Sequence, residues 1–250
     1  MSAISRPASD GPELEAVILA GGLGTRLRGV LDDRPKVLAP IADKPFLDHL
    51  LLALANAGVR RALLCLGHLA DMVVKHLQNN PPPLPVNWVV EPRPLGTGGA
   101  LRLARPKIGN RHALVMNGDT WIGFDLTSLR QRLWEADSLG ALVYAEVADI
   151  SRYGRLELDA DDYVAAFSEK DPSKTGPGII NGGVYLFTPA LLDKLAESNA
   201  ASLERDFLER LPPRSLAAFR ARGSFIDIGT PQSLAAAPAI IGGNAFGRVA

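Results

Sequence analysis

A glycine-rich loop with basic residues is the part of the sequence whose residue types most directly indicate chemistry. It reads GGLGTRL at 21–27, directly after the apolar run 16–20, and Lys36 follows ten residues after Arg26. Glycines allow backbone N–H groups to approach a phosphate closely. Arg26 can hold a phosphate in a bidentate fork, and Lys36 can act as a mobile point charge. The pattern predicts a polyphosphate site; the alternative is a tight turn with solvated basic residues.

Two familiar phosphate loops do not match this segment. The dinucleotide-binding fingerprint would need a third glycine where Leu27 stands, and it has no role for Arg26. The P-loop would need Gly-Lys-Ser or Gly-Lys-Thr at its end, and 21–27 lacks that ending. What remains is a glycine loop that carries a fixed cation.

Two aspartates stand where a divalent cation could bind beside this loop. Asp119 follows the apolar run 113–116, and Asp227 lies between Ile226 and Ile228. Asp119 could instead cap a helix or form a turn, and Asp227 could be a buried structural carboxylate. The apolar neighbours of Asp227 would make an unpaired charge costly, which favours a bound cation.

The first half of the chain alternates strand and helix patterns. Continuous apolar runs predict strands that are covered on both faces, as in a parallel sheet. These runs are 16–20, 62–66, 88–90, 113–116 and 142–145. Helical patterns cover 45–57 and 126–137, where Leu126, Leu129 and Leu133 share one face.

The second half contains more strand and less helix. Strand patterns cover 155–159, 164–168, 180–187 and 216–227, and helical stretches cover 189–197 and 202–210. The chain is therefore predicted to be an α/β protein, a three-layer α/β/α sandwich with a Rossmann-like, mixed, mostly parallel sheet. We expect a loose tail over 1–13 and one domain over 14–250.

Composition narrows the classes of partner. The 250 residues include 27 Lys plus Arg and 27 Asp plus Glu, so the formal net charge is zero. Binding to nucleic acid polymers or membranes usually needs a basic excess, and neither is expected here. The one cysteine, Cys65, lies in an apolar run and is predicted to be buried. The N-terminus lacks a secretory apolar segment, so we expect a cytoplasmic protein. A homo-oligomer is compatible with the sequence.

Five motifs in order resemble those of the sugar-1-phosphate nucleotidylyltransferases. They are GGLGTRL at 21–27 with Pro35-Lys36, LGTGGA at 95–100, NGD at 117–119, NGGVY at 181–185 and FIDIGTP at 225–231. The resemblance covers about residues 15 to 235 and implies the nucleotide-diphospho-sugar transferase type of fold. It also implies an enzyme that joins a sugar 1-phosphate to a nucleoside triphosphate and releases pyrophosphate. No β-helix domain is expected, because the chain ends soon after Pro231.

The resemblance implies a role for particular residues. The catalytic residues would be Arg26, Lys36, Asp119 and Lys170. The nucleotide would be bound by Leu19, Ala20, Gly21, Gly22, Gly24, Thr25, Arg26, Lys36, Glu91, Gly96, Thr97, Asn117 and Gly118. The sugar phosphate would be bound by Gly98, Tyr153, Gly154, Glu169, Lys170, Asn181 and Gly182. Asp119 and Asp227 would hold Mg²⁺ as the cofactor. Tyr153 could equally be a core tyrosine, and Glu169-Lys170 could be a solvated loop dipeptide.

Glu91 bears on the choice of base. It follows the run 88–90, and the resemblance places this segment against the base. A carboxylate can accept two parallel hydrogen bonds from the ring N–H and the exocyclic amine of guanine, whereas a pyrimidine offers one donor there. Guanine, and hence GTP, is favoured over uracil or thymine; a solvated Glu91 is the alternative.

Among these enzymes, the sequence most resembles the D-glycero-α-D-manno-heptose 1-phosphate guanylyltransferases. They share the glycine loop and an Arg-Tyr-Gly like 152–154. The resemblance implies GDP-heptose as the product, made for a bacterial surface polysaccharide. The alternatives are a guanylyl- or uridylyltransferase for another sugar 1-phosphate, such as mannose or an N-acetylated sugar, and a catalytically silent nucleotide-sugar-binding module.

Overall fold

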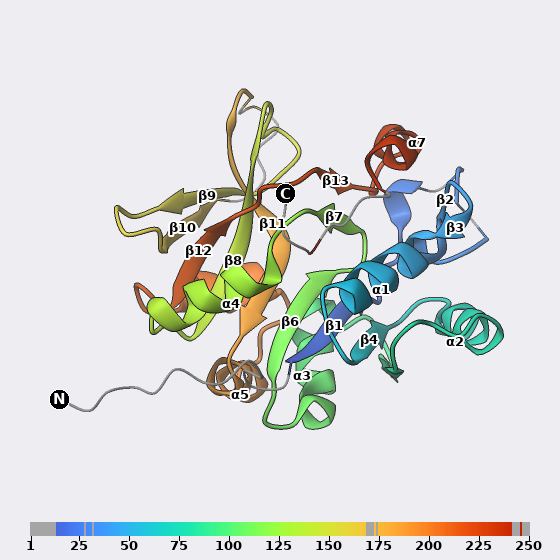
Figure 1. Cartoon of the computed structure of the whole chain (residues 1–250), viewed down its shortest axis with the longest axis horizontal. Coiled ribbons are helices and arrows are strands. Elements are labelled where there is room, and N and C mark those ends of the chain that lie inside the picture. Colours follow the sequence, from blue (N-terminus) through green and yellow to red (C-terminus); the bar gives the residue numbers. More distant parts are fainter. Residues whose placement is uncertain are drawn as a thin grey trace.

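The computed structural model describes residues 14–241, apart from 28, 32, 169–172 and 174, together with residue 246. The expected tail over 1–13 therefore lies outside the described residues. A mixed nine-stranded sheet forms the centre of the described part (Figure 1). Its parallel half has the order β6-β1-β4-β5. These strands are β1 (Leu14–Ala20), β4 (Ala62–Leu66), β5 (Val86–Val90) and β6 (His112–Asn117).

The other half of the sheet is built around one long strand, β11 (Gly178–Phe187). It pairs antiparallel with β6, so it joins the two halves of the sheet, and with β8 and β9. The remaining strands are β8 (Gly140–Val147), β9 (Arg155–Leu158), β10 (Val164–Ser168) and β12 (Leu216–Arg220). β12 runs parallel to β8, and β10 pairs antiparallel with β9.

Helices cover both faces of the sheet and bury two separate apolar cores. One core contains side chains of α1 (Phe46–Asn56), α2 (Ala70–Asn79), α4 (Leu126–Glu135) and α7 (Pro231–Ile240). The other contains side chains of α3 (Gly96–Ile108), α5 (Pro189–Glu197) and α6 (Leu203–Asp206). Leu126, Leu129 and Leu133 of α4 all face the first core, as their spacing predicts. The three-layer α/β/α sandwich with a mixed sheet is confirmed.

A two-stranded ribbon stands beside the main sheet. It pairs β7 (Thr120–Ile122) with β13 (Phe225–Asp227), and Asp227 lies opposite Thr120. At its far end, the Gly123 carbonyl accepts hydrogen bonds from the N–H groups of Arg222 and Gly223. A Cβ atom on Gly123 would lie 2.6 Å from the Cα of Gly223, so side chains are excluded from this crossing. The ribbon brings two segments about 100 residues apart in the chain into register.

Short elements complete the described part. They are the 3₁₀ helices Thr25–Leu27, Lys36–Leu38 and Leu208–Arg210, and the hairpin of β2 (Pro40–Ile41) with β3 (Lys44–Pro45).

Three expectations from the sequence need correction. The stretch 216–227 is not one strand, because the turn at Gly223 separates β12 from β13, which belongs to another sheet. The run 88–90 is not covered on both faces, because β5 is the edge strand and Val90 is 49% exposed. The stretch 202–210 is broken at Phe207 into α6 and a 3₁₀ turn. Helices α2, α3 and α7 were not expected.

In the part of the chain that the structure describes, no helix combines the length and apolarity needed to cross a membrane.

Burial determines the chemistry of Cys65, which lies in β4 and is fully buried. Desolvation, with the negative charge of Glu91 in second place, raises the pKa of the thiol to about 12. Only the thiolate is nucleophilic, so we expect Cys65 to resist iodoacetamide at pH 8 in the folded protein and to react once urea unfolds it. Mass spectrometry would measure the modified fraction; rapid labelling of the folded chain would contradict the prediction.

Candidate active site

The glycine loop lies at the edge of the sheet where the parallel strands end. A cavity of about 360 Å³ opens there, at the carboxyl ends of β1, β5 and β6. Open α/β sheets bind ligands at this edge, and the volume lies within the usual range for a small-molecule pocket. Most of the predicted nucleotide residues line it: Leu19, Ala20, Gly21, Gly22, Lys36, Glu91, Gly96, Thr97, Asn117 and Gly118.

Gly24 and Arg26 do not line this cavity. Gly24 has a left-handed backbone with φ of 62°, which favours glycine. Thr25 and Arg26 follow in the first 3₁₀ helix, and Arg26 is exposed. The charge of Arg26 nevertheless acts on Asp227, where it opposes a net rise in the pKa, so the guanidinium lies within electrostatic reach of that carboxylate.

Glu91 is held in place by the backbone at the rim of the cavity. Its Oε2 accepts a hydrogen bond from the N–H of Leu95 at 2.7 Å. A Cβ atom on Gly21 would overlap Oε1 of Glu91, so the glycine at position 21 allows the carboxylate to lie against the loop. The carboxylate therefore has one oxygen committed to the backbone, and its orientation toward the cavity is fixed before a ligand binds.

The LGTGGA segment forms the first turn of α3, which is a finding that the sequence did not indicate. A Cβ atom on Gly96 would overlap the carbonyl oxygen of Ala201, and the N–H of Gly98 donates to that oxygen at 2.9 Å. Gly98 is buried and does not line the cavity. It packs against Ala200 and Ala201. The glycines let the loop 200–201 approach the start of α3.

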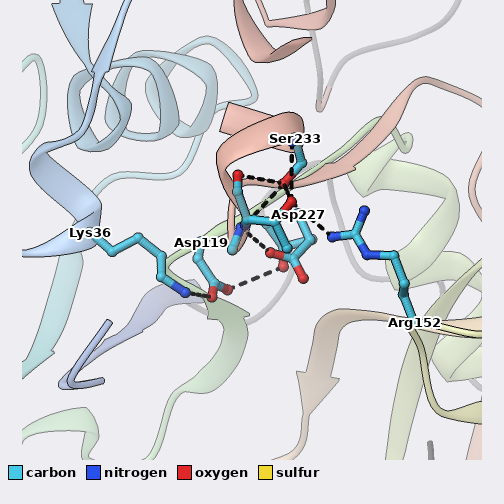
Figure 2. Close-up of polar contacts among 8 residues, drawn as sticks. Lys36, Asp119, Arg152, Asp227 and Ser233 are labelled. Atoms are coloured by element: carbon cyan, nitrogen blue, oxygen red, sulfur yellow. Dashed lines mark hydrogen bonds and ion pairs between the residues drawn. The ribbon is translucent and has the colours of Figure 1, made fainter. Parts of the chain in front are cut away.

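The two predicted metal aspartates lie side by side at the end of the ribbon. Asp119 follows β6 after one residue, and its carbonyl accepts the N–H of Ile228 at 2.9 Å. Asp227 Oδ1 accepts the N–H of Gly229 at 2.5 Å. Lys36 donates to Asp119 Oδ2 at 2.8 Å, with a lysine side chain that is only 17% exposed (Figure 2). The structure thus pairs Lys36 with a carboxylate at the edge of the nucleotide cavity.

Electrostatics at this pair is unfavourable for the charged form of Asp227. Desolvation raises the pKa of Asp227 above its usual value, and the negative charge of Asp119 raises it further. The N–H of Gly229 and the cations Lys36 and Arg26 act in the opposite direction and do not cancel the shift. Two carboxylates in one partly buried place are a charge arrangement that a further cation would stabilise.

The donor set at the pair fits a hard divalent cation. Among the described residues, no group of three or more His, Cys, Asp or Glu could enclose a metal. Two carboxylates alone suit Mg²⁺, because this ion keeps several water molecules and commonly binds one or two carboxylates together with substrate phosphates. Asp119 and Asp227 would therefore hold the cation, with its other positions open to phosphate oxygens.

Four of the predicted sugar residues, Tyr153, Gly154, Asn181 and Gly182, lie near the ribbon. The half-buried ring of Tyr153 packs edge-on against Phe225, with 5.4 Å between ring centroids. Desolvation chiefly raises the pKa of its hydroxyl, and the negative charge of Asp227 contributes to the same direction. The Gly154 carbonyl accepts the N–H of Asn181 at 3.4 Å, and Gly182 packs against Ile122 and Val143. Tyr153 thus serves packing and still borders the carboxylates.

A hydrogen-bonded chain that the sequence did not indicate connects Asn181 to the nucleotide cavity. Asn181 Nδ2 donates to the hydroxyl of Tyr185 at 2.7 Å, and that hydroxyl donates to Glu204 Oε1 at 2.8 Å. Glu204 Oε2 accepts from the hydroxyl of Thr97 at 3.3 Å. Because Tyr185 is fully buried, this chain of hydrogen bonds crosses the interior from Asn181 to the first turn of α3. A Ser-Leu-Glu sequence at 202–204 gives no local signal of this role.

Glu169 and Lys170 lie outside the described residues, so their predicted roles stay predictions.

Comparison with known proteins identifies the family. The model of the family described as "Nucleotidyl transferase" matches residues 15–242. The chain belongs to the nucleotidyl transferase family. It is 34% identical over 219 residues to D-glycero-alpha-D-manno-heptose 1-phosphate guanylyltransferase from Campylobacter jejuni, covering 88% of this chain and 96% of that protein.

Two further relatives extend the comparison. The crystal structure of HddC from Yersinia pseudotuberculosis complexed with GMP-PN superposes with a TM-score of 0.79 at 36% identity, covering 90% of this chain and 98% of that one. Mannose-1-phosphate guanylyltransferase from Mycobacterium tuberculosis is 35% identical over 204 residues, which are 80% of this chain and 55% of that protein. The family and the fold implied by the motifs are confirmed.

The raised pKa of Asp227 predicts a stability change in metal-free protein. A raised carboxyl pKa penalises the folded state above that pKa, and the penalty vanishes below the unfolded value of about 3.9. Asp227→Asn should therefore raise the melting temperature at pH 7 in the presence of EDTA, and the gain should shrink as the pH falls toward 4. The asparagine oxygen can still accept the N–H of Gly229. Differential scanning calorimetry, with exposed Asp71→Asn as the control, would test this; an equal or lower melting temperature at pH 7 would contradict it.

Proposed function

We propose that this enzyme transfers GMP from GTP to a sugar 1-phosphate, with D-glycero-α-D-manno-heptose 1-phosphate as the favoured sugar, and releases pyrophosphate. The observation that carries the proposal is one continuous site: a glycine-lined cavity with Glu91 at its rim opens onto Lys36 and the aspartate pair. Support for guanine comes from Glu91 and from the GMP-PN complex of HddC. Support for heptose comes from the relative that matches over nearly its whole length.

The reaction follows from the charges in the site. A phosphate oxygen of the sugar 1-phosphate is already anionic, so it can attack the α-phosphorus of GTP in line without a general base. The difficulty is the approach of two anions and the negative charge that develops on the leaving pyrophosphate. Lys36 and Arg26 would bind the triphosphate. Mg²⁺ held by Asp119 and Asp227 would supply further neutralisation of the phosphate oxygens. Lys170 is proposed from the sequence alone for the sugar phosphate.

Glu91 would read the base. Because Leu95 N–H binds Oε2, the carboxylate is held with its remaining lone pairs available to the cavity. These can accept from the ring N–H and the exocyclic amine of guanine. Gly21 contributes by leaving space for the carboxylate beside the loop.

A second candidate substrate is mannose 1-phosphate, because a mannose-1-phosphate guanylyltransferase matches 80% of this chain. The chain spans about half of that relative, 55% of its length, so heptose is preferred.

The proposal also keeps the reaction in the cytoplasm, where GTP is available. A pyrophosphate-release assay over four triphosphates and the two sugar 1-phosphates would test base and sugar together. Absence of release with GTP and both sugars would overturn the proposal.

The aspartate pair predicts a large loss of turnover on neutralisation. Asp119→Asn and Asp227→Asn should each lower kcat by at least about 100-fold, the scale of one preorganised electrostatic element. The change is nearly isosteric, so folding should survive, which circular dichroism would verify. Asp71→Asn, an exposed aspartate in the first turn of α2, should leave kcat unchanged. Near-normal turnover in both active-site variants would exclude the metal assignment.

Glu91→Gln tests the choice of base. In this variant, the N–H of Leu95 should keep its hydrogen bond to the side-chain oxygen, which leaves the amide NH₂ facing the donors of guanine. Such a mismatch costs about 1–3 kcal/mol, or roughly 5- to 150-fold in kcat/KM for GTP. UTP should lose less, because an amide can pair with a donor–acceptor edge. The ratio of kcat/KM for GTP to that for UTP should therefore fall, whereas exposed Glu197→Gln should not change it. A parent preference for UTP would refute guanine, and an unchanged ratio would exclude Glu91 as the reader.

A further inference from the structure

Arg152 is a basic residue at the active site to which the sequence analysis gives no role. Its Nη2 donates to the hydroxyl of Thr230 at 3.4 Å, and its guanidinium lies over the ring of Tyr153, 5.6 Å from the centroid. Thr230 is three residues after Asp227 and caps α7. Figure 2 shows the guanidinium extending toward the segment that carries Asp227. The arginine thus reaches the aspartate pair from a different part of the fold than Lys36 does.

The backbone turn that presents Arg152 is held by Asp149. Asp149 accepts the N–H of Ser151 at 3.1 Å and its hydroxyl at 2.8 Å. The N–H of Tyr153 closes the turn onto the carbonyl of Ile150 at 2.9 Å. The backbone bond from Ser151, followed by the bond from its hydroxyl, keeps the pKa of the Asp149 carboxyl below its usual value. The backbone of Arg152 is therefore positioned before a ligand binds, while the residue is exposed to solvent.

Arg152 has no carboxylate partner within ion-pair distance among the residues that the structure describes. Other arginines of the chain are paired, for example Arg105 with Asp193 and Arg220 with Glu146. A guanidinium has five N–H donors, and the hydroxyl of Thr230 accepts from one nitrogen of Arg152. The others remain for an anion, and a phosphate matches the fork of a guanidinium.

The position of Arg152 indicates which anion it binds. In Figure 2 the two aspartates lie between Lys36 and Arg152, so the two cations flank the pair on opposite sides. Lys36 lines the nucleotide cavity, whereas Arg152 does not. Arg152 instead contacts Tyr153, which packs on Phe225 of the ribbon. A triphosphate in the cavity would be on the Lys36 side, which leaves the Arg152 side for the second reactant.

We propose that Arg152 binds the phosphate of the sugar 1-phosphate and holds it on the side of the aspartate pair opposite Lys36. This assignment rests on the proposed function, because it takes a phosphorylated sugar as the second substrate. Arg152 adds a positive charge where a dianion must approach two carboxylates and a polyphosphate. The stacked Tyr153 ring and the Thr230 hydroxyl restrict the guanidinium before the substrate arrives.

The test compares Arg152→Gln, Arg152→Lys and the control Arg60→Gln, which removes a charge from an exposed arginine in the loop between α1 and β4. Loss of a charge-assisted phosphate bond should raise the KM for the sugar 1-phosphate by about 10- to 100-fold. The KM for the triphosphate should stay unchanged, because Arg152 is outside the nucleotide cavity. Arg152→Lys keeps the charge without the fork, so its KM should be intermediate. Arg60→Gln should behave like the parent, and melting curves would verify that all variants fold.

A second measurement identifies the group that is bound. The same sugar without its phosphate, used as a competitive inhibitor, should keep its inhibition constant in Arg152→Gln. An unchanged KM for the sugar 1-phosphate, an equal rise for the triphosphate, or a matching loss for the unphosphorylated sugar would each overturn the assignment. All comparisons use the triphosphate that the parent turns over best. A parent that prefers UTP would refute guanine, while the Arg152 comparison would still decide the role of Arg152.

Discussion

The repulsion between Asp119 and Asp227 is the interaction around which the rest of the site is arranged. Burial and the neighbouring carboxylate both favour the neutral form of Asp227, so the folded chain holds the pair at an energetic cost. The ribbon of β7 and β13 keeps the two carboxylates close together, because its backbone hydrogen bonds hold both segments without depending on the side chains. Lys36 offsets part of the charge through its bond to Asp119. A pair that remains unfavourable after this contact would gain stability from a further cation, and a ligand that binds the folded state alone stabilises it.

Close backbone approach is the second constraint, and glycines provide it where two functional segments meet. Gly21 lets the loop contact the carboxylate of Glu91, and Gly96 and Gly98 let the loop 200–201 reach the start of α3. At each place a Cβ atom would push apart elements that form the cavity wall. The glycines in the motifs therefore have different roles. Gly21 and Gly22 line the cavity, whereas Gly98 does not and instead packs against Ala200 and Ala201.

The sequence predicted the strands whose signals are local, and most of the residues it assigned to the nucleotide line the cavity. Continuous apolar runs located β1, β4 and β6, and the polar residues after them indicated the edge where the cavity opens. Long-range arrangements had no such signal. The turn at Gly223 and the transfer of β13 to a second sheet depend on a backbone contact with Gly123, 100 residues earlier. Helix α3 was missed because three glycines in its first turn are unfavourable for a helix, and packing against Ala200 and Ala201 outweighs that preference. Arg152 and Glu204 were missed because their partners are distant in the chain.

The chain from Asn181 through Tyr185 and Glu204 to Thr97 shows why these distant partners matter. The hydroxyl of Thr97 also accepts the N–H of Leu203 at 2.8 Å, so two hydrogen bonds at this one hydroxyl join α3 to α6. The buried tyrosine hydroxyl donates to a carboxylate and accepts from an amide, which leaves it no freedom to rotate without losing a bond. Because unsatisfied polar groups in the interior are costly, displacement of Asn181 would propagate to the wall of the nucleotide cavity. Under the proposed function, the two reactants would bind to walls that share one set of hydrogen bonds, and in-line attack requires that kind of fixed relation between them.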